Sequence, residues 1–135
     1  MQKIVIPRPI IEQLESHARG DSPNECCGML GGCEGRVQSC YQLRNLSATP
    51  EKNYFASPED LFRTMRQMRA AGEQLIAIYH SHPAGAAFPS RTDIDLAYYP
   101  EVAHVVVSLV PEVEIRAFMI RNRIVEAVAI EASEE

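Results

Sequence analysis

The sequence lacks the marks of a secreted or membrane-spanning protein. Its cysteines, Cys26, Cys27, Cys33 and Cys40, form no CxxC pair. They match no common zinc or redox pattern, so we expect small buried apolar side chains. No stretch approaches the roughly 18 apolar residues that cross a bilayer, and the apolar run at residues 4–6 is too short for a signal peptide. We therefore expect a cytoplasmic protein without a disulfide framework.

An excess of positive charge is also missing. The chain has 13 Lys and Arg residues against 18 Asp and Glu residues, which gives a formal net charge of −5. Nucleic acids and anionic membranes select basic surfaces, so neither is expected as a partner. The one basic cluster, Arg63, Arg66 and Arg69, has helical spacing and is interpreted as a solvated helix face.

The length and composition suit one folded domain. A chain of 135 residues, 46% of them hydrophobic, has room for one core and not for two, so residues 1–135 are treated as one unit. The order of predicted elements indicates an α+β or α/β domain with helices packed on a mixed sheet. Strands are predicted at residues 3–6, 26–30, 36–43, 75–79, 102–110, 114–121 and 123–130, and helices begin near Pro9, Pro58 and Ser90.

The second predicted helix has the clearest boundaries. Ser57 is a suitable N-cap, Pro58 suits the first turn, and Gly72 follows the last turn. The apolar residues of this segment recur at helical spacing. Its buried face is expected to consist of Leu61, Phe62, Met65 and Met68.

Two histidines stand directly after the central strand at residues 75–79. His80 and His82 are two residues apart, so on a strand they point to the same face. Imidazole nitrogens are good zinc ligands, and the third ligand is commonly a carboxylate. Asp93 follows eleven residues after His82, near a helix start, from which it can fold back onto the histidines. Three protein ligands and one open position are what a catalytic zinc site requires.

These residues also have alternative interpretations. Asp95 competes with Asp93, but residues two apart on a helix do not share a face, so only one can serve. Asp93 is preferred because it lies nearer the loop. The segment from Ser90 to Asp93 also matches a capping box, which starts a helix without any metal. The two histidines are alternatively hydrogen-bonding residues of the loop.

Four other side chains are less suited to catalysis. His17 lies beside polar positions of the first predicted helix and is interpreted as a surface residue. His104 begins a strand and is interpreted as a core or edge histidine with satisfied hydrogen bonds. Tyr98 and Tyr99 are interpreted as packing residues.

The spacing of the candidate ligands matches a known motif. Residues 80–93 reproduce the pattern His-x-His-x7-Ser-x2-Asp, and Glu25 stands upstream in the segment Asn-Glu-Cys-Cys-Gly-Met-Leu-Gly-Gly. In these features the sequence resembles the JAMM (MPN+) zinc metallopeptidases of the compact bacterial type. The resemblance covers nearly the whole chain. It implies a cytidine-deaminase-like fold of α/β/α-like layering, with a mixed, curved sheet and helices packed on it.

The resemblance also implies a role for each motif residue. Zinc, one ion per chain, would be bound by His80, His82 and Asp93. Glu25 would be the general base that takes a proton from water, and a base needs to reach the water rather than the metal. Ser90 would steady that water or the oxyanion of the tetrahedral intermediate.

The resemblance further implies a substrate. JAMM enzymes hydrolyse peptide or isopeptide bonds after the C-terminal tail of ubiquitin-like proteins, and compact bacterial forms resemble enzymes that act on ubiquitin-like sulfur carriers. We expect hydrolysis after the Gly-Gly tail of such a sulfur-carrier protein or its adduct, because residues 45–57 leave little room for loops that grip ubiquitin chains. One alternative is a non-catalytic MPN-type scaffold, although its expected loss of ligands is not seen. The other is a RadC-like protein linked to DNA repair, which the acidic charge does not favour.

Overall fold

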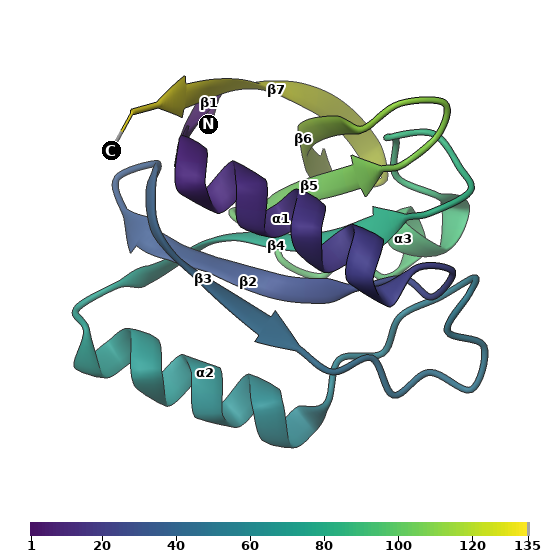
Figure 1. Cartoon of the computed structure of the whole chain (residues 1–135). Helices are drawn as coiled ribbons and strands as arrows, with labels where there is room; N and C mark the ends of the chain where they lie inside the picture. The colour runs from purple at the N-terminus through teal and green to yellow at the C-terminus, as the bar shows by residue number, and fades with distance from the viewer. Residues whose placement is uncertain (135) are drawn as a thin grey trace.

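A computed structural model describes residues 1–134 of the chain (Figure 1). Over this range the elements follow the predicted order of strands and helices. Most boundaries lie within a few residues of their predicted positions. The elements are β1 (Lys3–Pro7), α1 (Arg8–Asp21), β2 (Cys27–Cys33), β3 (Arg36–Leu43), α2 (Pro58–Ala70), β4 (Gln74–His82), α3 (Arg91–Asp95), β5 (Ala103–Ser108), β6 (Glu114–Arg121) and β7 (Ile124–Ser133).

The strands form one mixed sheet, as predicted, and its curvature is strong enough to close it. The strand order is β1-β3-β2-β4-β5-β6-β7, and β7 returns to pair with β1. Three of the pairings are parallel, namely β1 with β3, β1 with β7, and β4 with β5. The strand that carries the two histidines, β4, is therefore central, between β2 and β5.

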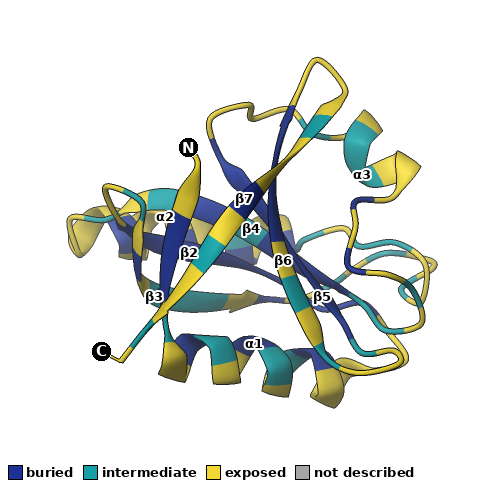
Figure 2. Cartoon of the chain, turned by 90° about the horizontal axis from the view of Figure 1, so that it is seen from above, coloured by how far each residue is buried: buried dark blue, intermediate teal, exposed yellow. Residues whose placement is uncertain are grey.

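Helix α1 packs against the inner face of the curved sheet. Pro9 stands in its first turn, where the missing N–H costs nothing. Its apolar stripe, Ile10, Leu14 and Ala18, is buried in the main core with residues of β1, β2, β4, β5, β6 and β7. Figure 2 shows the result, in which β5 is buried along its whole length while the outer side of α1 is exposed.

Helix α2 packs on the other side, against strands β2, β3 and β4 (Figure 1). Ser57 caps it as predicted, accepting a hydrogen bond from the Asp60 N–H at 3.2 Å. The predicted buried face is partly wrong, because Phe62 and Met65 are 64% and 57% exposed. The helix meets the sheet through a different stripe, in which Asp60 and Thr64 are buried with Met68.

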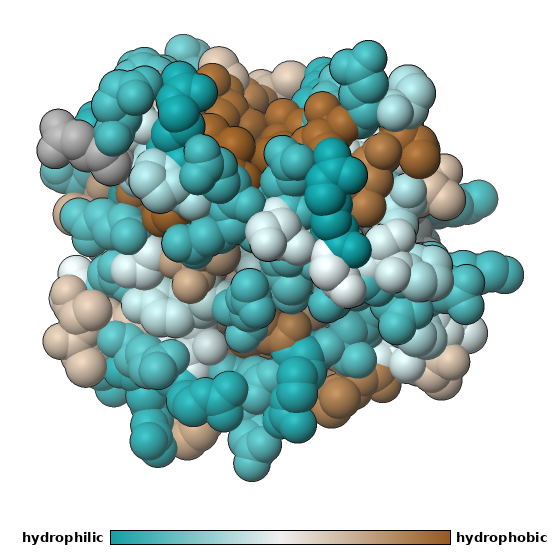
Figure 3. Space-filling view, viewed as in Figure 1, coloured by the Kyte–Doolittle hydropathy of each residue, from teal (hydrophilic) through white to brown (hydrophobic). Residues whose placement is uncertain are grey.

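The surface also departs from one prediction. Tyr98 and Tyr99, interpreted as packing residues, are 71% and 55% exposed, because they lie in the loop between α3 and β5 and not on an element of the sheet. Polar side chains cover most of the face that carries α1 and α2 (Figure 3). No helix within residues 1–134 is both long enough and apolar enough to cross a membrane.

Candidate metal centre and active site

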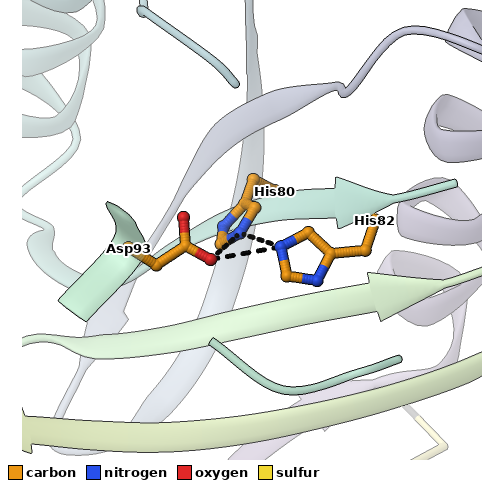
Figure 4. Close-up of side chains that lie close together, drawn as sticks. All are labelled: His80, His82 and Asp93. Atoms are coloured by element: carbon orange, nitrogen blue, oxygen red, sulfur yellow. Dashed lines mark hydrogen bonds and ion pairs between the residues drawn. The ribbon is translucent and has the colours of Figure 1, made fainter. Parts of the chain in front are cut away.

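The end of β4 and the start of α3 bring three predicted ligands together (Figure 4). The Nε2 atoms of His80 and His82 are 3.0 Å apart, and each lies about equally close to Oδ2 of Asp93, at 3.0 and 3.1 Å respectively. The ring of His80 is buried, and the side chains of His82 and Asp93 are 11% and 10% exposed. Within residues 1–134, these three form the one group of His, Cys, Asp or Glu whose ligand atoms converge closely enough for a metal ion.

The hydrogen bonds around this group favour a bound cation. Nδ1 of His82 lies 2.9 Å from the carbonyl oxygen of Ala86. A carbonyl only accepts, so Nδ1 carries the proton and a neutral His82 turns its Nε2 lone pair toward the Asp93 carboxylate. Two facing acceptors repel one another unless a proton or a cation lies between them. The donor set of two imidazoles and one carboxylate is the set that catalytic zinc sites use.

Hydrogen bonds within this group also shift the pKa values of Asp93 and His82. Burial alone would raise the pKa of Asp93, but the hydrogen bonds to His80 and His82 outweigh it and hold that pKa below its usual range. Burial would lower the pKa of His82, yet its bonds to Asp93 and to the Ala86 carbonyl raise it above the ordinary value. A positive charge is therefore stabilised next to the Asp93 carboxylate.

The Ser90–Asp93 segment caps a helix and also presents a candidate metal ligand. The predicted capping box is present: the Ser90 Oγ accepts a bond from the Asp93 N–H at 3.1 Å, and the Ser90 N–H donates to Asp93 Oδ2 at 2.8 Å. The cap fixes the same carboxylate oxygen that faces the two histidines. Asp95, the rival ligand, instead forms an ion pair with Arg123 on the surface.

Glu25 is held next to the histidines by the residue that follows it. The N–H of Cys26 donates to the Ser81 Oγ at 2.8 Å, and the Ser81 N–H donates to the Cys26 carbonyl at 3.1 Å. Ser81 stands between His80 and His82, so this pair of bonds aligns the chain at Glu25 with the end of β4. Burial raises the pKa of Glu25 to about 7, and the charges of His82 and Asp93 also act on it.

The structure adds neighbours that the sequence did not indicate. Tyr54, from the loop between β3 and α2, stacks on His80 with ring centroids 4.7 Å apart. His104 is buried in β5, but the expectation of a satisfied histidine is wrong, because its Nε2 has no hydrogen-bond partner. His17 is not a surface residue: its side chain is 8% exposed, and its Nδ1 lies 2.8 Å from the Tyr79 hydroxyl. These contacts join residues far apart in the chain, so no local pattern reveals them.

One large cavity lies away from this group. It has a volume of about 610 Å³ and is bounded by α1, β1, β3 and the C-terminal residues. A smaller cavity of about 220 Å³ opens beside Asp93, between the loop that carries Tyr54 and the segment that follows α3. Of these two cavities, the smaller one adjoins a candidate metal ligand.

Residues 7–121 match the family described as prokaryotic homologs of the JAB domain. The chain belongs to this family. A CysO-cysteine peptidase of Mycobacterium tuberculosis is 39% identical over 107 residues, which cover 78% of this chain and 73% of that protein. A desampylase of Haloferax volcanii is 33% identical over 103 residues, covering 72% of this chain and 74% of that protein. The expectation of a JAMM-type peptidase is confirmed at this level.

Solved structures show the same fold. A protein of Desulfitobacterium hafniense superposes with a TM-score of 0.88 at 33% identity, covering 98% of this chain and 94% of that protein. A JAB1/MPN domain protein of Archaeoglobus fulgidus, at 20% identity, has a TM-score of 0.66 and covers 97% of this chain and 100% of that chain. The second likeness is evidence for the fold alone. The predicted JAMM fold is confirmed.

Proposed function

We propose that residues 1–135 form one zinc-dependent peptidase domain that hydrolyses the peptide or isopeptide bond after the Gly-Gly tail of a ubiquitin-like sulfur-carrier protein. The convergence of three ligand atoms on one point, within 4.8 Å of one another, is the observation that carries this proposal. His80, His82 and Asp93 are the proposed ligands of one zinc ion. The names of the two peptidase relatives support a carrier conjugate as the substrate. We assign the protein to the cytoplasm, because its cysteines are free and thiols stay reduced in that compartment.

The proposed reaction divides the chemistry among the residues of the site. Zinc, when held by these ligands, polarises a carbonyl group and lowers the pKa of water to about 7. Glu25 accepts a proton from the attacking water and returns it to the leaving amine. A buried carboxyl group with a pKa of about 7 suits both steps near neutral pH. The Ser90 hydroxyl, which accepts from the Asp93 N–H, keeps its own proton to donate to the oxygen that gains charge.

The loop at residues 83–89 is an argument for a substrate whose tail consists of glycine residues. It is tied down on both sides, because the Ser108 hydroxyl donates to the Gly85 carbonyl at 2.6 Å and the His82 ring bonds to Ala86. A fixed wall next to the candidate ligands leaves little space for side chains on the two residues that precede the scissile bond. Glycine lets the substrate backbone approach closely.

A carrier protein with three different tails tests this proposal. Fusions ending in Gly-Gly, Ala-Ala or Val-Val before a reporter peptide are incubated with the zinc-loaded protein, and release is measured by mass spectrometry. Cleavage after Gly-Gly should exceed cleavage after Val-Val by about a hundredfold, because misplacement of about 1 Å has an effect of that size. Equal cleavage of all three tails would refute the idea that the path to the scissile bond is too narrow for side chains. Failure to cleave any tail, with zinc bound, would refute the proposed activity.

A further inference from the structure

His104 faces the same side of the sheet as the candidate metal ligands. In the parallel pairing of β4 and β5, His104 stands opposite Ile78. His80 follows two residues after Ile78, and side chains two apart on a strand share a face. A substrate that extends along this face from the metal ligands therefore passes His104.

The ring of His104 has an unsatisfied hydrogen-bonding atom. The residue is 7% exposed, and its Nε2 is fully buried without a partner. Burial lowers the pKa of His104, so near neutral pH the ring is uncharged, with one N–H and one lone pair. A buried polar atom without a partner is unfavourable, and such atoms are rare in native proteins. Nothing in residues 1–134 satisfies this one. A molecule that enters the adjoining cavity and shifts the His104 ring can therefore supply the missing partner.

His104 lines the cavity of about 220 Å³ that opens beside Asp93. Most of the lining is aromatic or aliphatic, and a few polar groups stand among these residues, which is the composition of a binding site for a small group. A second apolar cavity, of about 290 Å³, adjoins it and shares five lining residues, Tyr54, Ala56, Leu61, Ile78 and Tyr99.

We propose that this cavity is a specificity subsite for one substrate side chain, and that His104 recognises a neutral hydrogen-bonding group at the end of that side chain. The inference rests on the proposed function. The apolar walls select an aromatic or aliphatic body. No lysine or arginine lines the cavity, so an anionic group finds no countercharge there and its burial is costly. A tyrosine side chain has the required combination, because its ring is apolar and its hydroxyl both donates and accepts.

Two positions of a substrate can supply this side chain. The glycines of a Gly-Gly tail have none, so the occupant is either the first residue before Gly-Gly or the residue after the scissile bond. Both present the same chemistry to His104. Two peptide series separate them, one varied before Gly-Gly and one varied after it.

The experiment compares tyrosine with phenylalanine, which differ by the hydroxyl alone. Peptides of both series, each with Tyr, Phe or Ala at the varied position, are titrated by calorimetry into the zinc-loaded Glu25→Gln protein, so that binding is measured without turnover. The same peptides are then given to the wild-type enzyme for kcat and KM. In one series, Tyr should bind about three- to tenfold more tightly than Phe, the range expected for one hydrogen bond to a neutral group. With the wild-type enzyme, the preference for Tyr should appear as a lower KM for the Tyr peptide than for the Phe peptide, with similar kcat values.

Variants connect the preference to His104. His104→Leu should bind Tyr and Phe equally, while His104→Gln, which keeps a hydrogen-bonding end, should retain part of the preference. His17→Gln is the matched control, since His17 is also buried but contacts Tyr79 on the opposite face of β4, and it should leave the preference intact. Equal binding of Tyr and Phe to the protein with His104 in place, in both series, would overturn the subsite even if Gly-Gly peptides are cleaved. A Tyr preference lost in His104→Leu, without any turnover by wild type, would support the subsite and refute the proposed activity.

Discussion

The ring of Tyr79 occupies the space in which a Cβ atom at position 28 would lie. Gly28 and Tyr79 are direct partners in the pairing of β2 with β4. Tyr79 is fully buried, and its hydroxyl contacts His17 and Cys40, so the ring cannot move aside without losing those contacts. Gly28 thus allows the large Tyr79 ring, from the strand that ends in the candidate metal ligands, to lie across β2.

Gly28→Ala should therefore destabilise the fold. Forcing extra volume into a packed core costs about 1–3 kcal/mol, and this loss should appear as a lower urea midpoint. Gly20→Ala is the control, because a Cβ atom at Gly20 meets nothing within 4 Å and alanine is the better helix former. A Gly28→Ala protein as stable as wild type would show that the Tyr79 ring is free to shift.

The buried carboxylate of Asp60 should make stability depend on pH. Asp60 accepts hydrogen bonds from the Arg44 guanidinium, the Arg44 backbone N–H and Arg63, and these bonds hold its pKa well below the usual range. A lowered folded-state pKa stabilises the protein above the unfolded-state pKa, near 3.9. This contribution is lost as the pH falls below that value toward the folded-state pKa.

Urea midpoints of wild type and Asp60→Asn between pH 7 and pH 2.5 check this expectation. The variant should be less stable at pH 7, and the gap should narrow below about pH 4, where aspartates of unfolded chains take up protons. Glu59→Gln is the control, because the Glu59 side chain is 79% exposed and exposed ion pairs contribute little. A gap that stays constant over the whole range would contradict the role given to the ionised Asp60.

The four cysteines should differ in reactivity. Burial raises the pKa values of Cys26 and Cys27 to about 12 and also raises the pKa of Cys40, whereas Cys33 is exposed. Thiolates are the reactive species, so iodoacetamide at pH 8 should label Cys33 first and the others only after denaturation. Peptide mass spectrometry measures the order. Rapid labelling of Cys26 in a folded Cys33→Ser protein would contradict its placement in the core.

Local patterns predict that His80, His82 and Asp93 lie together, as they do in the structure, because these residues are close in sequence. Two histidines at a strand end and an aspartate at the next helix start need only alternation, a loop and a cap. The resemblance alone points to Glu25 as the candidate base, since its position next to the histidines depends on bonds between Cys26 and Ser81, 55 residues apart.

The features that cannot be predicted from the sequence have a common physical cause. The buried face of α2 depends on how the helix meets the sheet. The Arg44 backbone N–H, next to the end of β3, holds the buried Asp60, whereas Phe62 is exposed. The closure of the sheet depends on β1 meeting β7 at the other end of the chain. Neither relationship is visible in the local spacing of apolar residues, so neither can be predicted without the structure.

Metal removal should inactivate the protein. We expect one zinc ion per chain, which a chelator strips and added zinc restores. Acid should act similarly, because protons compete with zinc for imidazole nitrogens below about pH 6.5. Metal analysis measures the loss of zinc. The thermal unfolding midpoint should fall at the same time, since a metal that binds only the folded state raises stability. A protein that retains full turnover after its zinc is removed would contradict the proposed chemistry.

Separate substitutions should distinguish the base from the ligands. Glu25→Gln removes the proton acceptor and leaves His80, His82 and Asp93 unchanged, so zinc content and thermal midpoint should stay near wild type while turnover falls by about 10²- to 10⁴-fold. His82→Ala removes an Nε2 that lies 3.1 Å from Asp93 Oδ2, so both zinc content and turnover should fall. Arg19→Gln, in an exposed ion pair on α1, is the control for unrelated changes. If Glu25→Gln loses zinc as readily as His82→Ala, Glu25 acts through the metal rather than as the base.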